Sequence, residues 1–175
     1  MVLSSLRTFS LNVGMRRDLA GLRALILQYK FDLVLIQELN LTQCELQGKI
    51  SDLGYECIVN IDSEDSAKPG TAFIWKTTVP ISNVENILKC RIQVAFLNNY
   101  AFLNIYAPSG SGKRYERSIF YAVDLYRLFH LYKGYSWVMG GDYNAVLSHL
   151  DIENGTGFDQ KKCPQLADIV NIMGG

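Results

Sequence analysis

In residues 137–144, with the sequence WVMGGDYN, a carboxylate and a carboxamide follow shortly after an apolar run. The run predicts a buried strand, and the two glycines after it predict an abrupt end to that strand. Asp142 and Asn144 are two residues apart, so an extended backbone would point both side chains to the same side. Strand ends of this kind are common positions for reactive groups in α/β proteins. The alternative is a purely structural turn, in which an Asx-type cap begins a helix at Ala145.

Three other apolar runs also end in a polar side chain. They are expected to be strands at residues 6–13, 32–38 and 101–106, and their polar ends are Asn12, Glu38 and Tyr106. The middle run is continuously apolar, which is typical of a strand buried on both faces. The last run is followed by Pro108, which cannot donate to a sheet ladder. Acidic and amide side chains gathered at strand ends suit a hard divalent cation and a phosphate ester.

Four short motifs contain these polar residues and follow one another along the chain: SLNV at 10–13, LIQE at 35–38, NIYAP at 104–108 and GDYN at 141–144. In this order and spacing they resemble the motifs of the exonuclease–endonuclease–phosphatase superfamily. The closest resemblance is to the apurinic-type endonuclease domain of non-LTR (LINE-type) retrotransposons, to which VLSHLD at 146–151 is also similar. The resemblance runs from about residue 6 to the C-terminus.

The resemblance implies an α/β (α+β) fold, a four-layer α/β/β/α sandwich of two mixed, mostly antiparallel sheets. It implies a single domain over residues 1–175 that hydrolyses phosphodiester bonds of DNA, with Mg²⁺ or Mn²⁺ as cofactor. It also implies a DNA substrate and, in the parent element, a fused or associated reverse transcriptase. Two other functions stay open: a phosphatase acting on a small phosphoester or lipid headgroup, and a noncatalytic remnant that binds a metal or a partner.

The resemblance also assigns roles to the polar residues. Glu38 would be the principal protein ligand of the metal, with Asp142 as a second ligand. Asp142 would in addition orient or deprotonate the attacking water. Asn12 and Asn144 would stabilise the charge that develops on the phosphate, or hold Asp142 and the metal in place. Tyr106 would donate a hydrogen bond to a phosphate oxygen or to the leaving group.

Two motifs of the superfamily are absent from the sequence. The family closes with an Arg-Ile-Asp motif and a Ser-Asp-His motif, which supply a further Asp and the catalytic His, and neither occurs here. The only histidines, His130 and His149, lie in other contexts and are expected to be ordinary surface residues. We therefore expect a C-terminally truncated domain that lacks its last strands and cleaves orders of magnitude more slowly than an intact site.

Length and charge limit the class of protein. A chain of 175 residues with 49% apolar residues is long enough for one domain with a substantial core. Its 17 basic and 17 acidic residues cancel, which argues against high-affinity nonspecific DNA binding. A nuclease needs only a local basic rim, and Lys113, Arg114 and Arg117 are candidates for phosphate contacts. The alternative for these three is the solvated start of a helix. We expect a monomer.

The four cysteines, at positions 44, 57, 90 and 163, are widely spaced and form no Cys-x-x-Cys pair. They are interpreted as reduced structural thiols rather than zinc ligands or a disulfide framework. The sequence shows neither an apolar run of membrane-spanning length nor the N-terminal pattern of a signal peptide. These features predict a nuclear or cytoplasmic protein that is not secreted and has no membrane partner.

Helices and further strands are predicted around the motifs. Apolar residues at helical spacing predict helices at residues 16–29, 42–53 and 111–133. Asp18 is expected in the first turn of the first helix, and Thr42 and Glu45 are expected to form a capping box on the second. Further strands are predicted at residues 55–61, 71–76, 84–89, 92–97 and 100–106, with a hairpin turn at Asn98-Asn99 and loops at 63–70 and 154–162.

Overall fold

The computed structural model describes residues 6–65, 67–152 and 162–174. The chain forms two compact units: the first comprises Met1–Tyr106 and Ser136–Asp142, and the second comprises Ala107–Tyr135 and Tyr143–Gly175. That the whole chain is a single domain stays a prediction. Among the described residues, no helix combines the length and the apolar character that crossing a bilayer requires.

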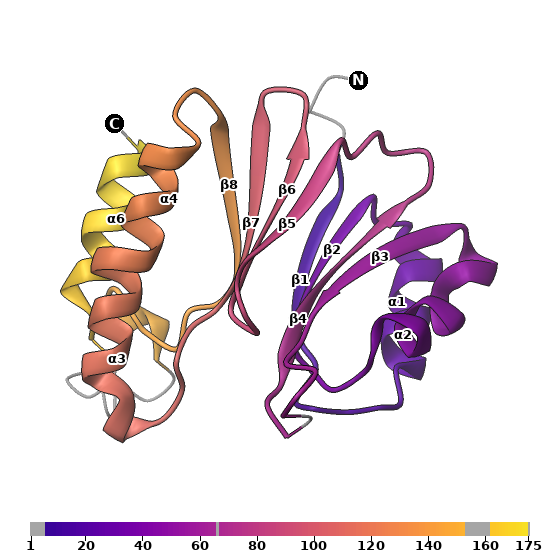
Figure 1. The fold of residues 1–175 in the computed structure, drawn as a ribbon, viewed down its shortest axis with the longest axis horizontal. Helices are drawn as coiled ribbons and strands as arrows, with labels where there is room; N and C mark the ends of the chain where they lie inside the picture. Colours follow the sequence, from indigo (N-terminus) through magenta and orange to yellow (C-terminus); the bar gives the residue numbers. More distant parts are fainter. Residues whose placement is uncertain (1–5, 66, 153–161, 175) are drawn as a thin grey trace. The chain divides into compact units, whose positions relative to one another are not determined.

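The first unit contains two four-stranded mixed sheets (Figure 1). Sheet A has the strand order β1-β2-β4-β3 and is formed by β1 (Thr8–Asn12), β2 (Leu33–Leu39), β3 (Tyr55–Asn60) and β4 (Gly70–Lys76). Sheet B has the order β5-β6-β7-β8 and is formed by β5 (Asn83–Leu88), β6 (Ile92–Leu97), β7 (Tyr100–Tyr106) and β8 (Ser136–Asp142). One pair in each sheet is parallel, β1 with β2 and β7 with β8, and the other pairs are antiparallel. The predicted fold class, an α/β sandwich of two mixed, mostly antiparallel sheets, is confirmed.

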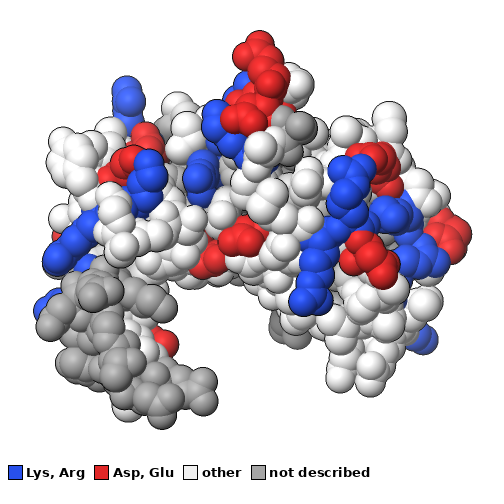
Figure 2. All heavy atoms as spheres, turned by 90° about the horizontal axis from the view of Figure 1, so that it is seen from below, with Lys and Arg blue, Asp and Glu red and all other residues white. Residues whose placement is uncertain are grey.

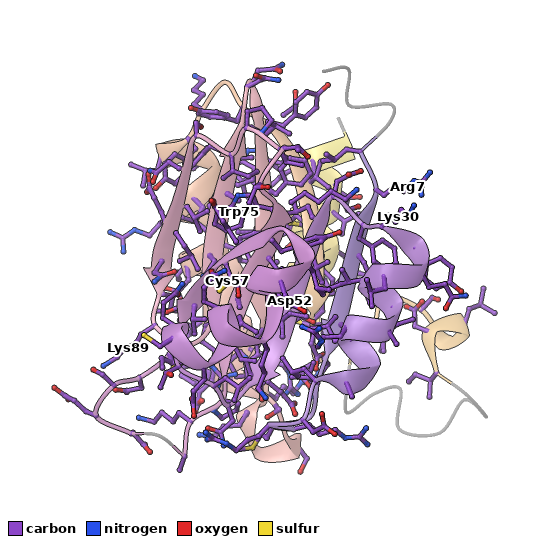
Figure 3. All side chains as sticks on the ribbon, turned by 90° about the vertical axis from the view of Figure 1, so that its right-hand side faces the viewer. Arg7, Lys30, Asp52, Cys57, Trp75 and Lys89 are labelled. Atoms are coloured by element: carbon purple, nitrogen blue, oxygen red, sulfur yellow. The ribbon has the colours of Figure 1, made fainter. Side chains whose placement is uncertain are left out.

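Strand β2 shows how the layers of the first unit stack. Leu33 and Leu35 point into an apolar core between the two sheets, which also contains Phe102 of sheet B. Val34 and Ile36 point the other way, into a core under helices α1 (Ala20–Tyr29) and α2 (Gln43–Ile50). The two helices lie over the outer face of sheet A when the unit is seen from their side (Figure 3). Burial on both faces explains why the sequence of β2 is continuously apolar.

Local sequence signals set the boundaries of α2 and of the hairpin between β6 and β7. Thr42 is the N-cap of α2: Glu45 N donates to Thr42 Oγ1 at 3.3 Å, and Thr42 N donates to the Glu45 carboxylate at 2.8 Å. The predicted capping box is therefore confirmed. The α-helix ends at Ile50 and continues as a 3-10 turn, η2 (Ser51–Leu53), rather than as the predicted helix to 53. Asn98, in the predicted hairpin turn, has the left-handed φ of 53° that such turns require.

Helix α1 begins later than predicted. The sequence pattern placed its start at residue 16, but the helix starts at Ala20. Gly14 and Met15 both adopt positive φ, 58° and 59°, so the chain turns here before a helix can form. Asp18 therefore lies ahead of the helix, where its carboxylate accepts a hydrogen bond from Ala20 N at 2.9 Å. The prediction that it belongs to the first helical turn is wrong.

The second unit is mainly helical. It contains η3 (Ser111–Lys113), α3 (Arg114–Ile119), the π-helical segment η4 (Phe120–Leu125), α4 (Tyr126–Leu131), η5 (His149–Asp151) and α6 (Pro164–Gly174). The segments from η3 to α4 follow one another without a gap, so the helix predicted at 111–133 is present with a π-helical centre. Helix α6 packs against η4. The loop predicted at 154–162 lies outside the described residues except at its last position.

Candidate active site

Glu38 lies at an irregularity in strand β2. The pairing of β2 with β4 shifts between Gln37 and Leu39, so Glu38 is an extra residue in its strand. Its φ of 54° is in the left-handed region, and among the described residues it is the only non-glycine residue inside a strand with a positive φ. A bulge of this kind takes a side chain out of the regular alternation and gives it a new direction. Such locally strained residues are concentrated at functional sites.

The Glu38 carboxylate is half-buried and forms no hydrogen bond or ion pair with any other residue that the structure describes. Its backbone, by contrast, is fixed, because Met15 N donates to Glu38 O at 2.8 Å. Withdrawing a carboxylate from water is unfavourable unless a cation or a donor completes its environment. The Glu38 side chain is therefore suited to hold a cation.

Packing explains the two glycines that precede Asp142. Gly141 has a φ of 144°, and a Cβ at this position would lie 2.7 Å from the backbone nitrogen of Ile105 in the neighbouring strand. A Cβ on Gly140 would lie 2.9 Å from the Leu35 side chain of sheet A. The contact at Gly141 is with backbone and excludes a larger residue, whereas a Cβ on Gly140 would require only that the Leu35 side chain shift. The glycines therefore let β8 run tightly against its neighbours and bring Asp142 to the end of the strand beside Tyr106, its partner in the parallel pair.

Asn12 and Asp142 form a hydrogen bond although they are 130 residues apart in the sequence. Asn12 Nδ2 donates to Asp142 Oδ2 at 2.7 Å, and Asn12 Oδ1 accepts a hydrogen bond from Gly14 N at 2.9 Å. Because the backbone uses the amide oxygen, the amide nitrogen is left to face the carboxylate. Asn12 ends β1 of sheet A and Asp142 ends β8 of sheet B, so this bond joins the two sheets at one end of the first unit.

Tyr106 is buried at the end of β7, with only 3% of its surface exposed. The guanidinium of Arg91 lies over its ring, 4.5 Å from the ring centroid, and Arg91 Nη1 donates to Tyr106 O at 3.3 Å. This stacking fixes the plane of the phenol and places a positive charge beside it. Arg91 is not among the site residues predicted from the sequence. A cation just before a mostly apolar strand is a weak signal.

Asn144 does not continue the strand that contains Asp142. Strand β8 ends at Asp142, and Asn144 belongs to the second unit, with a φ of 47°. Its Nδ2 donates to Ala107 O of the same unit at 2.9 Å. The prediction that Asp142 and Asn144 alternate along one extended backbone is therefore wrong. The structural alternative also fails, because no helix begins at Ala145.

The candidate basic rim belongs to the second unit. Lys113 and Arg114 are exposed at the start of α3, and Lys113 forms an ion pair with Glu116 of the same turn. Arg117 is different, because only 3% of it is exposed and its Nη1 donates to Pro108 O at 3.1 Å and to Gly110 O at 2.7 Å. Arg117 therefore holds the chain before the helix and is unavailable to a phosphate.

Both histidines belong to the second unit. His130 is exposed on α4, where its ring packs edge-on against Tyr126 with the centroids 4.6 Å apart. This position agrees with the predicted surface role. His149 lies in η5, and its side chain is outside what the structure describes.

Ion pairing leaves little unbalanced charge around the loops of the first unit. Arg17 pairs with Glu45, and Lys89 pairs with Asp62 at 2.6 Å, a contact that lowers the pKa of the Asp62 carboxyl to about 2. Lys68 lies 3.6 Å from the Asp62 carboxylate. Figure 2 shows basic and acidic side chains interspersed on the face it presents, with no broad area of one sign. That the chain lacks strong nonspecific attraction to nucleic acid stays a prediction from its net charge.

All four cysteines are free, as predicted for reduced structural thiols. Cys57, Cys90 and Cys163 are buried, whereas Cys44 is exposed. Burial raises the pKa of the Cys57 thiol to about 11 and also raises the pKa of the Cys90 thiol. These two thiols are therefore protonated at neutral pH and are poor metal ligands or nucleophiles.

The polar groups of the first unit suit Mg²⁺, which needs few protein ligands, better than a metal that is coordinated entirely by protein side chains. No group of three or more His, Cys, Asp or Glu side chains that could hold a metal occurs within residues 6–65, 67–152 and 162–174. Mg²⁺ is commonly held by one or two carboxylates and keeps several waters. Glu38 follows Gln37, the residue paired with Asn12, and Asn12 in turn contacts Asp142. This arrangement supplies two carboxylates and an amide at neighbouring strand ends.

Several solved structures share the fold of this chain. The chain resembles the 3'-5' exonuclease NExo from Neisseria meningitidis with a TM-score of 0.73 and 16% identity, over 94% of this chain and 70% of that one. A variant of NExo from Neisseria, described as a 3' phosphatase bound to a product DNA hairpin, matches with a TM-score of 0.65 and 17% identity, over 81% of this chain and 58% of that one. A humanized form of D. rerio TDP2 matches with a TM-score of 0.65 and 17% identity, over 94% of this chain and 66% of that one.

These identities show a shared fold, and the chain spans between 58% and 70% of the three structures. No curated protein sequence matches the chain significantly. The Endonuclease/Exonuclease/phosphatase family model matches residues 9–161, a range that contains Asn12, Glu38, Tyr106 and Asp142. With most of its length matched, and with both sheets and the polar strand ends inside that match, the chain belongs to the Endonuclease/Exonuclease/phosphatase family.

Proposed function

We propose that the chain is a Mg²⁺-dependent, or Mn²⁺-dependent, DNA endonuclease of the type found in non-LTR retrotransposons. The observation that carries the proposal is the contact of Asn12 with Asp142, beside Tyr106 and close in the strand pairing to Glu38, whose carboxylate has no partner among the described residues. Phosphodiester hydrolysis needs a cation site, a group that handles the proton of water, and donors for the phosphate oxygens. The four residues supply each of these.

Glu38 is the principal ligand in this proposal, and Asp142 is the second. A bound Mg²⁺ would supply positive charge to a phosphate oxygen and to the developing negative charge. Glu38 is prepared for this role because its backbone is fixed in the bulge and its carboxylate has no partner among the described residues. A preformed ligand of this kind lowers the cost of ordering when the site is filled.

Asp142 also orients the attacking water and accepts its proton. Asn12 Nδ2 donates to Oδ2 of Asp142 at 2.7 Å, which restricts the rotation of the carboxylate. Positioning a nucleophile in this way is a large contribution to rate. A carboxylate that turned freely would lose part of that contribution.

Tyr106 donates its phenolic hydrogen to a phosphate oxygen or to the leaving oxygen. The guanidinium of Arg91 lies over its ring. Asn144 in the second unit is proposed to stabilise the charge on the phosphate, and Lys113 and Arg114 to contact the DNA backbone. Each of these is a separate proposal that a substitution can test.

The substrate and setting follow from the resemblance of the motifs. The proposed substrate is DNA, the proposed compartment is nuclear or cytoplasmic, and the parent element would supply a fused or associated reverse transcriptase. The sequence contains no Ser-Asp-His motif, so the expected cleavage rate is low. A phosphatase is the second candidate, because one similar structure is described as a 3' phosphatase.

The test uses purified chain with supercoiled plasmid, a duplex with one abasic site and an oligonucleotide with a 3'-phosphate. Each substrate is incubated with Mg²⁺, with EDTA, and with Asp142→Asn in place of the natural chain. Asp52→Asn is the matched control, because Asp52 is an exposed carboxylate paired with Arg23 on the helix side of sheet A (Figure 3). Circular dichroism confirms that each variant is folded.

The proposal expects nicking that requires Mg²⁺ and Asp142 and is unchanged in Asp52→Asn. Release of phosphate without nicking would instead favour the phosphatase. No turnover of any substrate by folded protein, with stabilisation by Mg²⁺, would favour a noncatalytic remnant. Nicking that persists in Asp142→Asn would refute the assignment of the site.

A further inference from the structure

In each sheet of the first unit, a row of paired, mostly polar residues crosses the strands next to the candidate site. In sheet A the paired residues that form one row are Asn12, Gln37, Thr71 and Asn60. In sheet B the paired residues that form the other row are Asn86, Gln93, Asn104 and Gly140. Every buried polar residue that the structure describes in the first unit belongs to one of these rows. The interior is otherwise apolar, so polarity is concentrated at one level of the sandwich.

Gln37 and Asn104 join the rows directly across the two sheets. Gln37 Nε2 donates to Asn104 Oδ1 at 2.8 Å. Asn104 Nδ2 donates in turn to two carbonyls of sheet A, Ile36 O at 3.1 Å and Ala72 O at 2.9 Å. A side chain of sheet B thus makes three hydrogen bonds to sheet A. Ser10 of β1 also contacts the Gln37 amide, with Nε2 donating to its Oγ at 3.1 Å.

Stability alone does not explain this bridge. Gln37 and Asn104 are 1% and 0% exposed, and burying amides is unfavourable compared with apolar side chains of the same shape. The hydrogen bonding of the rows is also incomplete, because Thr71 Oγ1 and Gln93 Oε1 are buried without a hydrogen-bond partner among the described residues. Apolar contact, by comparison, is favourable but not directional, so it does not fix how two sheets are aligned. Directional bonds between buried groups do fix such an alignment.

The position of the bridge indicates what it aligns. Gln37 immediately precedes Glu38 in β2, and Asn104 lies two residues before Tyr106 in β7. Glu38 belongs to sheet A, whereas Tyr106 and Asp142 belong to sheet B. The distance between the two carboxylates therefore depends on how the sheets are aligned at this end.

We propose that Gln37 and Asn104 are positioning residues that hold Glu38 of sheet A in register with Tyr106 and Asp142 of sheet B. The inference rests on the proposed function, since it assumes that these carboxylates hold Mg²⁺. Groups that orient metal ligands without touching the metal typically change affinity or activity by about 10- to 100-fold when they are replaced. The bridge is expected to act on the Mg²⁺ affinity in this range.

The chain offers a matched control in the same rows. Gln93 is also fully buried, and its Nε2 donates across the sheets to Ile58 O at 3.1 Å and within sheet B to Asn86 Oδ1 at 2.9 Å. Its strand, β6, carries none of the proposed catalytic residues. Gln93→Met and Gln37→Met are therefore the same chemical change in the same kind of environment, at different distances along the sequence from Glu38.

The first measurement is the apparent Mg²⁺ dissociation constant, fitted to the rise of the melting temperature with Mg²⁺ concentration, which reports metal binding to the folded chain without turnover. Gln37→Met and Asn104→Leu are expected to raise this constant by about tenfold or more and to slow plasmid nicking, whereas Gln93→Met changes neither. The double variant Gln37→Met/Asn104→Leu is expected to be no worse than the more affected single variant, because both remove one bridge. Gln37→Asn, which keeps the amide but shortens it by one methylene, serves if Gln37→Met does not fold.

Equal shifts in Gln37→Met and Gln93→Met, in an active natural chain, would overturn the positioning role and leave the proposed function intact. Additive effects of Gln37→Met and Asn104→Leu would also overturn it, because independent residues do not form one bridge. A natural chain that is neither stabilised by Mg²⁺ nor able to cleave DNA would refute the proposed function itself, and the positioning role with it.

Discussion

The contact between Asn12 and Asp142 predicts a pH-dependent loss of stability in the variant Asn12→Asp. The substitution is nearly isosteric, but it replaces the amide nitrogen that lies 2.7 Å from Asp142 Oδ2 with a second carboxylate oxygen. Two unit charges about 4 Å apart repel by about 1 kcal/mol in water and by about 4 kcal/mol at the effective dielectric of a protein surface. Asn12 is exposed, so the loss is expected between these limits.

The sign of the pH dependence follows from linkage. Repulsion raises the folded-state pKa of one carboxyl above its unfolded value of about 3.9. Below about pH 3.9 this carboxyl is protonated in both the folded and the unfolded variant. A protonated carboxyl can still donate a hydrogen bond to its neighbour, so the free energy of unfolding of the variant is then close to that of the natural chain. As pH rises toward the folded-state pKa, only the folded state retains the proton, so stability relative to the natural chain is lost. A loss of about 1–4 kcal/mol corresponds to about one to three pKa units, which places the transition between about pH 4 and pH 7.

Urea unfolding at pH values from 4 to 8 measures this difference, with Asn98→Asp as the control. Asn98 is exposed in the turn at the opposite end of β7 from Tyr106, so the control adds the same charge away from Asp142. Addition of Mg²⁺ at pH 8 is expected to recover part of the loss, because a cation between two carboxylates removes their repulsion. A loss in Asn12→Asp that matches the control at every pH would show that the Asn12–Asp142 contact is not formed in solution.

Four further predictions address the backbone, a cap and the thiols. Gly141→Ala is expected to lose about 3 kcal/mol or more in urea unfolding, because its Cβ would overlap the backbone of the neighbouring strand. Thr42→Ala is expected to lose about 1 kcal/mol through the capping box and to leave the Mg²⁺ dependence unchanged. A thiol reagent at pH 8 is expected to modify exposed Cys44 first, whereas Cys57, with a pKa of about 11, reacts only after urea is added. Glu38→Gly is expected to be about 1 kcal/mol more stable than Glu38→Ala in urea, because its φ of 54° suits glycine, although neither variant should cleave DNA.

The polar strand ends could be predicted because of how the strands pair. Each sheet contains one parallel pair, β1 with β2 and β7 with β8, and parallel strands bring their carboxyl ends to the same edge. Residues that follow apolar runs therefore become neighbours: Asn12 pairs with Gln37, and Tyr106 pairs with Asp142. Each motif is short, but because the strands that carry the motifs are parallel, the residues at their ends lie next to one another in the sheet.

Other features depend on contacts that no local pattern contains. The Glu38 bulge arises in the pairing with β4, which the sequence of β2 by itself does not contain. Gly141 is required because the backbone of Ile105 in the neighbouring strand approaches it, and Arg91 lies over the ring of Tyr106. Each is a tertiary contact between residues far apart in sequence. The late start of α1 was missed for a local reason, since positive φ at Met15 is unusual for a residue with a long side chain.

Three departures from locally favourable choices lie near the candidate site. The capping box at Thr42 and the turn at Asn98 obey local rules and lie away from it. Glu38, in contrast, adopts a left-handed conformation inside a strand, and Gln37 and Asn104 are amides in an apolar interior. A core chosen for stability alone would favour a regular strand and apolar residues at these three positions. Their common location, at the level where two carboxylates and a buried tyrosine come to the ends of their strands, is what positioning reactive groups would require.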